Sequence, residues 1–281
     1  MRLLLSSLMF TLFLTGCGDS DAPARPDQTT RQDAQETTST PPDKQPADPA
    51  DPADHGGDTP LVSKPQTLER KSEPCPEDPC SSVTLQWLTF PEDPALTEAL
   101  ENSLIHQLSN GEDEGVSSLA EVADRFLADA RKAEVADSSI GWELTSKVAV
   151  GGEWRDIANL QLETYEFTGG AHGMPVLQLL NWDRRELRRI ELADILQPGK
   201  EEAFWAEAAK AHVRWLEQEA QADDEFRDNW PFQQTGDFDM TYDGVELHYN
   251  VYSIGPYAMG QPELTVPWNK LDGLIRERYL P

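Results

Sequence analysis

The chain has 281 residues, of which 51 are Asp or Glu and 23 are Lys or Arg, so its formal net charge is −28. A surface this negative repels nucleic acid and anionic lipid, which argues against both as partners, and it would attract a cationic protein instead. Solubility alone is the competing explanation for so acidic a composition.

The first residues have the pattern of an export signal. Residues 1–16 place one Arg before an apolar run that is shorter than the roughly 20 residues of a membrane span. They lead to Cys17 through a sequence that resembles the bacterial lipobox, in which the Cys is lipidated; an ordinary signal peptide cleaved nearby is the alternative. By the same resemblance, Gly18 favours the outer membrane. We therefore predict a lipid-anchored protein of the cell envelope, facing the periplasm.

Residues 17–76 are rich in Pro, Asp, Thr, Gln and Ala and poor in large aliphatic side chains. Such a segment cannot bury enough apolar surface to offset the entropy of ordering. We predict a disordered tether that proline keeps semi-extended. Cys75 and Cys80 form an even pair in an oxidising compartment, so we expect a disulfide. A metal site there is not expected, because no second Cys or His cluster completes four ligands.

The first folded elements are predicted from alternation and capping. Alternating apolar residues indicate a strand at Val83–Trp87. Asp93 before Pro94 predicts a capped helix, and Ser118 with Glu121 predicts a capping box for a second helix. The inner faces of these helices would carry Leu96, Leu100, Leu104 and Leu108, and Leu119, Val122, Phe126 and Ala130.

In the middle of the chain, apolar and polar residues alternate with a period of two. Residues 142–150 and 158–162 predict two strands of a hairpin that turns at Gly151–Gly152. A third strand is predicted at 176–182, and residues 183–185 turn it into another at 187–192.

The C-terminal part combines helices with a second hairpin. Glu201–Ala220 predicts the longest helix, in which His212 is interpreted as a packed or half-exposed residue rather than a ligand. The turn Asp243–Gly244 joins two further strands, a short strand covers 264–266, and a closing helix is predicted from Trp268 to Arg278. Because no regular βαβ order appears, we predict an α+β fold of antiparallel hairpins packed with several helices. Two sub-modules, 77–182 and 183–281, would join near a glycine-rich loop.

Two stretches stand out as candidate binding segments. The loop at 168–173 is rich in glycine, which suits positive φ or close backbone approach, and His172 is its titratable side chain. The stretch Tyr252–Gly260 places aromatic groups beside Gly and Pro and suits a contact surface. The alternative is that Tyr252 and Tyr257 only plug the sheet. The candidate binding residues are Thr168, Gly169, Gly170, His172, Gly173, Tyr257 and Gly260.

Catalysis has little support in the sequence. It contains no zinc-protease helix motif, phosphate-binding loop, dinucleotide fingerprint or nucleophile elbow. His172 could serve as a general base, but no nucleophile signature accompanies it. With 51 acidic residues, paired carboxylates occur at any spacing and do not identify a glycosidase. We predict a protein that is not an enzyme and that uses no cofactor and no metal.

The segment 165–173, Tyr-Glu-Phe-Thr-Gly-Gly-Ala-His-Gly, resembles the tyrosine-x-x-threonine-glycine-glycine-alanine-histidine-glycine signature of the RsiV-like family. Blocks at 192–196, 238–244, 252–260 and 264–268 resemble the rest of the same module in order. The resemblance implies an α+β fold. Because the family includes a lysozyme-binding domain, it also implies a cationic glycan hydrolase such as lysozyme as partner. A module that binds peptidoglycan or another envelope glycan is the alternative.

The resemblance covers roughly residues 82–280. The chain departs from the family's larger members because it shows no sigma-factor-binding segment, no spanning helix and no deacetylase domain. We therefore expect neither anti-sigma activity nor deacetylation, and we expect the module to act by binding.

Overall fold

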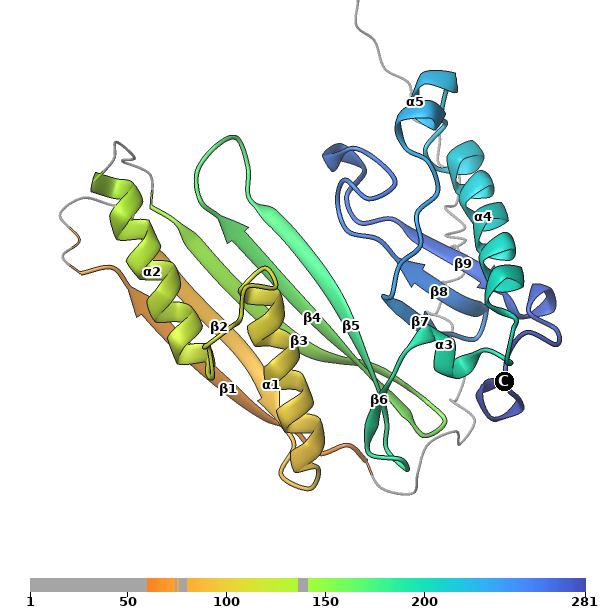
Figure 1. Cartoon of the computed structure of the whole chain (residues 1–281), viewed down its shortest axis with the longest axis horizontal. Helices are drawn as coiled ribbons and strands as arrows, with labels where there is room; N and C mark the ends of the chain where they lie inside the picture. Colours follow the sequence, from red (N-terminus) through yellow and green to blue (C-terminus); the bar gives the residue numbers. More distant parts are fainter. Residues whose placement is uncertain (1–59, 74, 76–79, 136–140) are drawn as a thin grey trace, which may run out of the picture. The chain divides into compact units, whose positions relative to one another are not determined.

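The structure, a computed structural model, describes residues 60–73, 75, 80–135 and 141–281. These residues form a six-stranded sheet, a three-stranded sheet and several helices (Figure 1), so the predicted α+β class is confirmed. The strands of the larger sheet are β1 (Lys64–Lys71), β2 (Ser82–Thr89), β3 (Glu143–Trp154), β4 (Ile157–Phe167), β5 (Met174–Asp183) and β6 (Arg188–Ile190).

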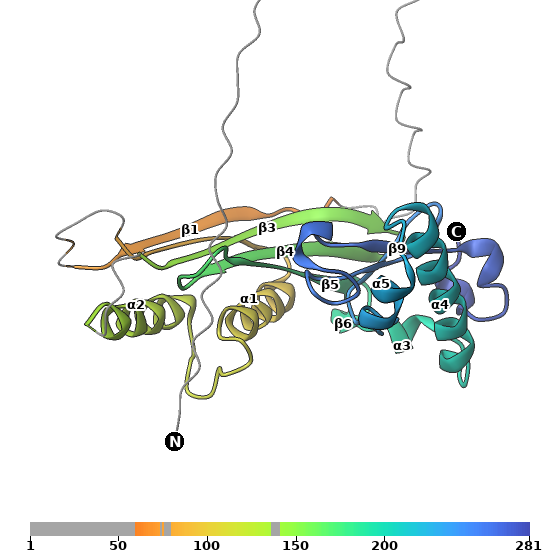
Figure 2. The same ribbon diagram turned by 90° about the horizontal axis from the view of Figure 1, so that it is seen from above.

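The strands of the larger sheet lie side by side in sequence order, from β1 to β6. All neighbours are antiparallel except β2 and β3, which are parallel. A parallel pair needs a long crossover, and this crossover contains α1 (Pro94–Leu108) and α2 (Leu119–Val135). Both helices lie on the same face of the sheet (Figure 2).

The first hydrophobic core lies between these two helices and the sheet. The predicted cap is present: Asp93 Oδ1 accepts a hydrogen bond from the Leu96 amide at 2.9 Å, and Pro94 is the first helical residue. The predicted leucine stripe of α1 is buried, as are Leu119 and Val122 of α2. Local capping and helical periodicity were therefore sufficient to predict this region.

The strand β1 corrects the sequence analysis, which assigned residues 17–76 to a disordered tether. Residues 64–71 pair with β2 along their whole length. Leu68 packs against the first core, while most of the other β1 side chains are exposed and polar. An edge strand needs few apolar residues because only one of its sides is paired, and the composition of the segment therefore concealed it.

Most predictions for the N-terminal region fall outside the described residues, including the signal peptide at 1–16 and the lipidated Cys17. Within the described residues, Cys75 is joined to Cys80 by a disulfide, with the two Cα atoms 5.7 Å apart. No helix of the described part combines the length and the apolar character that a membrane crossing requires.

The β3–β4 hairpin turns later than predicted. β3 continues through Gly151–Gly152 to Trp154, with a register shift at the glycine pair, and the chain reverses at Arg155, whose φ is 55°. A Cβ on Gly151 would lie 2.6 Å from Asn159 Oδ1. The glycine pair therefore permits a bulge inside a strand rather than a turn.

The smaller sheet has the order β7 (Phe238–Met240), β8 (Gly244–His248) and β9 (Glu263–Pro267), with both pairs antiparallel. The long helix α4 (Glu201–Gln218) packs against it and buries the aromatic residues Phe204 and Trp215. Two shorter helices, α3 (Leu192–Ile195) and α5 (Asp224–Asn229), flank α4 in the sequence. The predicted hairpin around Gly244 and the predicted long helix are both present.

The predicted closing helix from Trp268 to Arg278 is wrong. The segment contains two short 3-10 helices, η2 (Trp268–Lys270) and η3 (Glu277–Tyr279). Between them Gly273 has a φ of 68°, which interrupts helical geometry. The backbone groups instead bond to another element: Gln197 N donates to Leu274 O at 2.7 Å.

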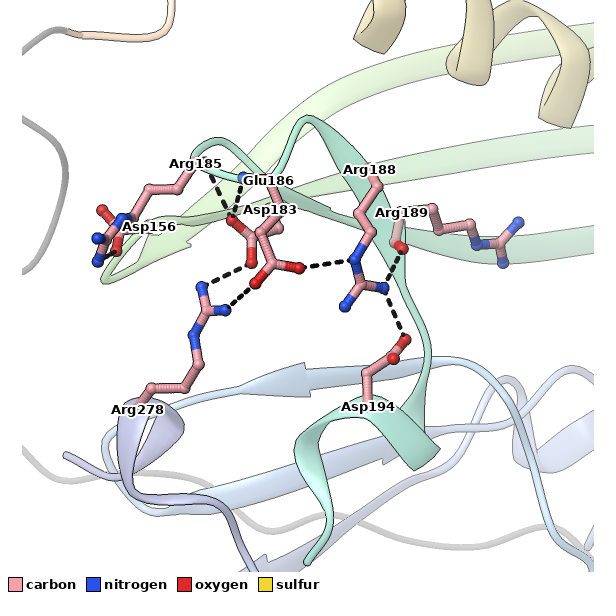
Figure 3. A network of polar contacts seen from close by, with 8 residues as sticks. All are labelled: Asp156, Asp183, Arg185, Glu186, Arg188, Arg189, Asp194 and Arg278. Atoms are coloured by element: carbon pink, nitrogen blue, oxygen red, sulfur yellow. Dashed lines mark hydrogen bonds and ion pairs between the residues drawn. The ribbon is translucent and has the colours of Figure 1, made fainter.

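A network of charged side chains joins the turn after β5 to the C-terminal segment (Figure 3). Asp183, whose side chain is fully buried, accepts a hydrogen bond from Arg278 at 2.6 Å. Arg278 also pairs with Glu186, and Arg188 links Glu186 to Asp194 on α3. Because the buried carboxylate is both paired and hydrogen-bonded, this network satisfies its charge and has a structural role.

Candidate functional site

The loop between β4 and β5 is shaped by its glycines. Gly169 and Gly170 have φ values of 105° and 93°, a region that favours glycine. Gly173 is buried, and a Cβ at this position would overlap the ring of Tyr165. The absence of a side chain therefore lets an aromatic ring pack directly on the loop backbone, while Thr168 and the neighbouring Gly170 remain exposed.

The second candidate segment meets this loop at His172. The ring of Tyr257, in the 3-10 helix η1 (Tyr257–Met259), stacks on the imidazole with ring centroids 3.8 Å apart and planes 24° apart. The Tyr257 hydroxyl donates a hydrogen bond to Gly173 O at 3.1 Å. Gly260 ends η1 with a φ of 69°. Two segments about 80 residues apart in the sequence thus form one site.

The polar atoms of His172 are used within this site. Its Nδ1 lies 3.1 Å from Gly173 O, and a carbonyl can only accept, so Nδ1 carries the proton in this arrangement. Its Nε2 lies 3.3 Å from the Tyr252 hydroxyl, which can then donate to it. The imidazole is therefore held in one orientation.

Asn250 fixes the second segment to the sheet. Its side chain accepts a hydrogen bond from Leu177 N at 2.7 Å and donates one to Leu177 O at 3.0 Å, as a neighbouring strand would. Gln261 also donates to Asn250 Oδ1 at 2.9 Å. Further along β5, Asn181 donates to Phe238 O at 2.7 Å. These bonds run along β5 and place the tyrosines beside the glycine loop.

Trp230 extends the site beyond the predicted segments, and Tyr252, which begins the second predicted segment, joins the predicted binding residues. Tyr252 is 46% exposed, so part of its ring is open to solvent while the rest is buried. Its φ of 65° is unusual for a bulky residue and marks a backbone held by its surroundings. The Trp230 ring stacks beside it at 6.4 Å with 25° between the planes. We name the set of Tyr165, His172, Trp230, Tyr252 and Tyr257 the aromatic cluster.

An open groove adjoins the aromatic cluster on the face of the larger sheet opposite α1 and α2. Tyr165 and Gln261 line its end near the cluster, and polar side chains such as Thr84, Lys147 and Glu163 line the strands. These side chains point away from the first core because they alternate with its buried residues along β2, β3 and β4. The groove and the cluster together form a continuous polar and aromatic surface.

Some residues of this site could be predicted from the sequence, and others could not. The glycine loop and Tyr257 were identified because Gly, Pro and aromatic residues are unusual at that density. Trp230 follows α5 in a polar stretch and carries no such signal. Tyr165 was recognised as the first residue of the signature at 165–173, but it lies in β4 and was not selected as a binding residue.

Comparisons with known proteins identify the family. The family described as "Protein of unknown function (DUF3298)" matches residues 193–269. A DUF3298 family protein of Pseudomonas aeruginosa has a similar structure, with 33% identity, a TM-score of 0.70, and coverage of 80% of this chain and 98% of that chain. A DUF3298 family member of Bacteroides fragilis shares the fold at 20% identity and a TM-score of 0.57, with coverage of 80% and 96%. No curated protein matches the chain. The chain therefore belongs to the DUF3298 family.

Proposed function

We propose that this protein is a non-enzymatic lipoprotein of the cell envelope that binds a cationic glycan hydrolase, such as lysozyme, through the aromatic cluster. The proposal rests on one observation: the glycine loop at 168–173 contacts the segment 252–260 at His172. This contact creates a partly exposed aromatic surface. Aromatic side chains contribute strongly to binding energy at protein interfaces. The resemblance of both segments to the RsiV-like family supports the choice of lysozyme.

Charge supports the same class of partner. The net charge of −28 would attract a cationic protein over a distance of several ångströms and raise the rate of association. Complementary charge contributes to the on-rate and to specificity more than to affinity. The proposal therefore assigns attraction to the acidic surface and the specific contact to the aromatic cluster.

Calorimetry of the full chain with lysozyme at low and at moderate salt tests the proposal. We expect saturable binding that weakens as salt rises. His172→Ala and Tyr257→Ala should each weaken the affinity by roughly tenfold, because each removes one ring of the stack. His106→Ala is the matched control, since His106 is an exposed histidine on α1, away from the aromatic cluster. The absence of binding heat at both salt concentrations would exclude lysozyme as the partner.

A specific observation favours an envelope glycan as a second candidate. Trp230 and Tyr252 present nearly parallel rings, and an open groove with polar side chains lies beside Tyr165. Apolar ring faces combined with a few polar groups are typical of small-molecule sites. Sedimentation of the full chain with purified peptidoglycan sacculi separates the two candidates: a glycan-binding module sediments with them, and Trp230→Ala should reduce the sedimented fraction. A protein that binds only lysozyme stays in the supernatant.

A further inference from the structure

Three potential metal ligands lie on one face of the smaller sheet. Glu246 and His248 are two residues apart in β8, so their side chains point to the same face. Glu263 in β9 is the direct cross-strand partner of His248. On the opposite face Leu247 and Leu264 are buried in the hydrophobic core that the smaller sheet shares with α4. Strand pairing, rather than a local motif, brings these three side chains together.

The imidazole of His248 is buried and has unmet hydrogen-bonding capacity. The residue is 7% exposed, and neither ring nitrogen has a hydrogen-bond partner among the residues that the structure describes. Its backbone is fixed on both sides: His248 N donates to Asp237 O at 2.9 Å, and Thr235 Oγ1 donates to His248 O at 3.0 Å. A buried polar side chain without a hydrogen bond is destabilising, so a ligand that bound a ring nitrogen of His248 would stabilise the folded protein.

The three groups lie close enough together to share one metal ion, and neither carboxylate makes a hydrogen bond to the imidazole. His248 Nε2 lies 3.6 Å from Glu246 Oε1, and His248 Nδ1 lies 3.5 Å from Glu263 Oε1. One nitrogen or oxygen from each of the three residues falls within a set whose members are all within 4.8 Å of one another. Two ligands of one tetrahedral zinc ion, each about 2.1 Å from it, are about 3.4 Å apart. Because an imidazole binds an ion through one nitrogen, only one carboxylate already lies near this separation from the binding nitrogen, and the other reaches the ion by rotating its side chain, as the exposed Glu263 is free to do.

Among the residues that the structure describes, further acidic side chains lie near the cluster. Burial is the main reason that the pKa of Glu246 rises to about 7, and its acidic neighbours Glu263, Asp239 and Asp243 raise it further. A bound dication would neutralise the two carboxylates and accept the imidazole nitrogen.

We propose that Glu246, His248 and Glu263 form a binding site for a divalent transition-metal cation, represented by Zn²⁺. Imidazole and carboxylate are ordinary ligands of zinc, whereas magnesium and calcium prefer oxygen ligands alone. The side chain of Glu263 is 58% exposed and gives the ion a route from solvent. Three protein ligands leave a further coordination position for water or for a group of a partner.

Titration of Zn²⁺ into the full chain tests this site. Every sample carries Cys17→Ser, which prevents lipidation and excludes the free Cys17 thiol of unlipidated chains, a group that would bind zinc on its own. We expect one saturable site, and zinc should also raise the midpoint of thermal unfolding, because a ligand that binds the folded state stabilises it. His248→Gln should weaken the binding at least tenfold and abolish the rise in the midpoint.

Two further variants and two further cations keep the test decisive. Glu263→Gln should weaken zinc binding at an exposed position where folding is not at risk. His106→Gln should leave it unchanged, since it removes an exposed histidine that also lies beside a carboxylate, that of Asp113. Zinc binding that is absent, or equally tight in His248→Gln and Glu263→Gln, overturns the site, and the three side chains then form a proton-sharing cluster. Binding of Mg²⁺ or Ca²⁺ as tight as that of Zn²⁺ overturns the assignment to a transition metal.

Discussion

His172 and His248 lie in two regions of the molecule that differ in how far the imidazole is exposed and in whether its nitrogens are hydrogen-bonded. In the aromatic cluster, His172 is exposed, and both of its ring nitrogens have partners at 3.1 and 3.3 Å. On the smaller sheet, His248 is buried between two carboxylates, without a hydrogen bond to its ring from any described residue. The first arrangement suits contact with a large partner, and the second suits a small ligand that penetrates between side chains. The glycine-rich motif therefore contains only one of the two histidines to which we assign a proposed role.

The largest loss of stability is expected from a substitution in the smaller sheet. In Gly244→Ala the new Cβ would overlap the carbonyl of Val266, which belongs to the backbone of β9 and cannot move without breaking strand pairing. We expect a loss of about 3 kcal/mol in the free energy of unfolding and a loss of zinc binding, measured by urea denaturation and by titration. Gly236→Ala is the control, because a Cβ there would meet open space. Equal stability of the two variants would contradict the packing at β8.

A smaller loss of stability is expected from a substitution in the glycine loop. In Gly173→Ala the added methyl group would overlap the ring of Tyr165, but that side chain can shift where a backbone cannot. We expect destabilisation of about 2 kcal/mol in denaturant unfolding, with reduced lysozyme binding and unchanged zinc binding. Gly152→Ala serves as the control, since nothing lies within 4 Å of its Cβ position. A parallel loss of zinc binding would show that the two regions are coupled rather than independent.

The pH dependence of the free energy of unfolding should reveal the raised pKa of Glu246. The pKa of Glu246 is raised from 4.5 to about 7 in the folded protein, so the folded state holds a proton that the unfolded state has lost between these values. The stability from this group is complete below about pH 4.5 and is lost as pH rises through about 7. Solvent screening of the partly exposed carboxyl leaves an effect on the order of 1 kcal/mol.

Denaturant unfolding at several pH values in the presence of a chelator measures this effect. Glu246→Gln should flatten the fall in stability between pH 4.5 and pH 7. Glu225→Gln, at an exposed position on α5, should leave the fall unchanged. An identical slope in Glu246→Gln and the unmodified chain would remove Glu246 as its source.

The smallest effect is expected from a single hydroxyl in the aromatic cluster. Tyr257→Phe keeps the ring that stacks on His172 and removes only the hydrogen bond to Gly173 O. We expect a loss of about 0.5 kcal/mol in stability and nearly normal partner binding, measured by unfolding and calorimetry. Tyr242→Phe is the matched control at an exposed tyrosine. A large loss of binding in Tyr257→Phe would show that the hydroxyl, rather than the ring, makes the contact.

Several elements followed from local sequence alone. The cap at Asp93 with Pro94 and the leucine stripe of α1 were predicted because capping and helical period act within a few residues. The edge strand β1 was missed because its polar composition resembles a linker, and its order comes from hydrogen bonds to β2. The closing helix was wrongly predicted because Gly273 and contacts with Gln197 favoured another path.

The same distinction applies to the two sites. The glycine loop and Tyr257 were selected for their residue types, but their meeting depends on Asn250, whose bonds to β5 span 73 residues of sequence. Glu246 and His248 look like ordinary alternating strand residues. Glu263, the third residue of the proposed metal site, lies beside His248 only because β9 pairs with β8.

The sequence by itself determined the acidic charge, the α+β class, the capped helices and the loop that must contain glycine, because composition, helical period and positive φ are local properties. The tertiary structure alone decided which distant segments touch. It stacked Tyr257 on His172 and placed Glu263 beside His248, because strand pairing and core packing, rather than nearness in the chain, set those distances.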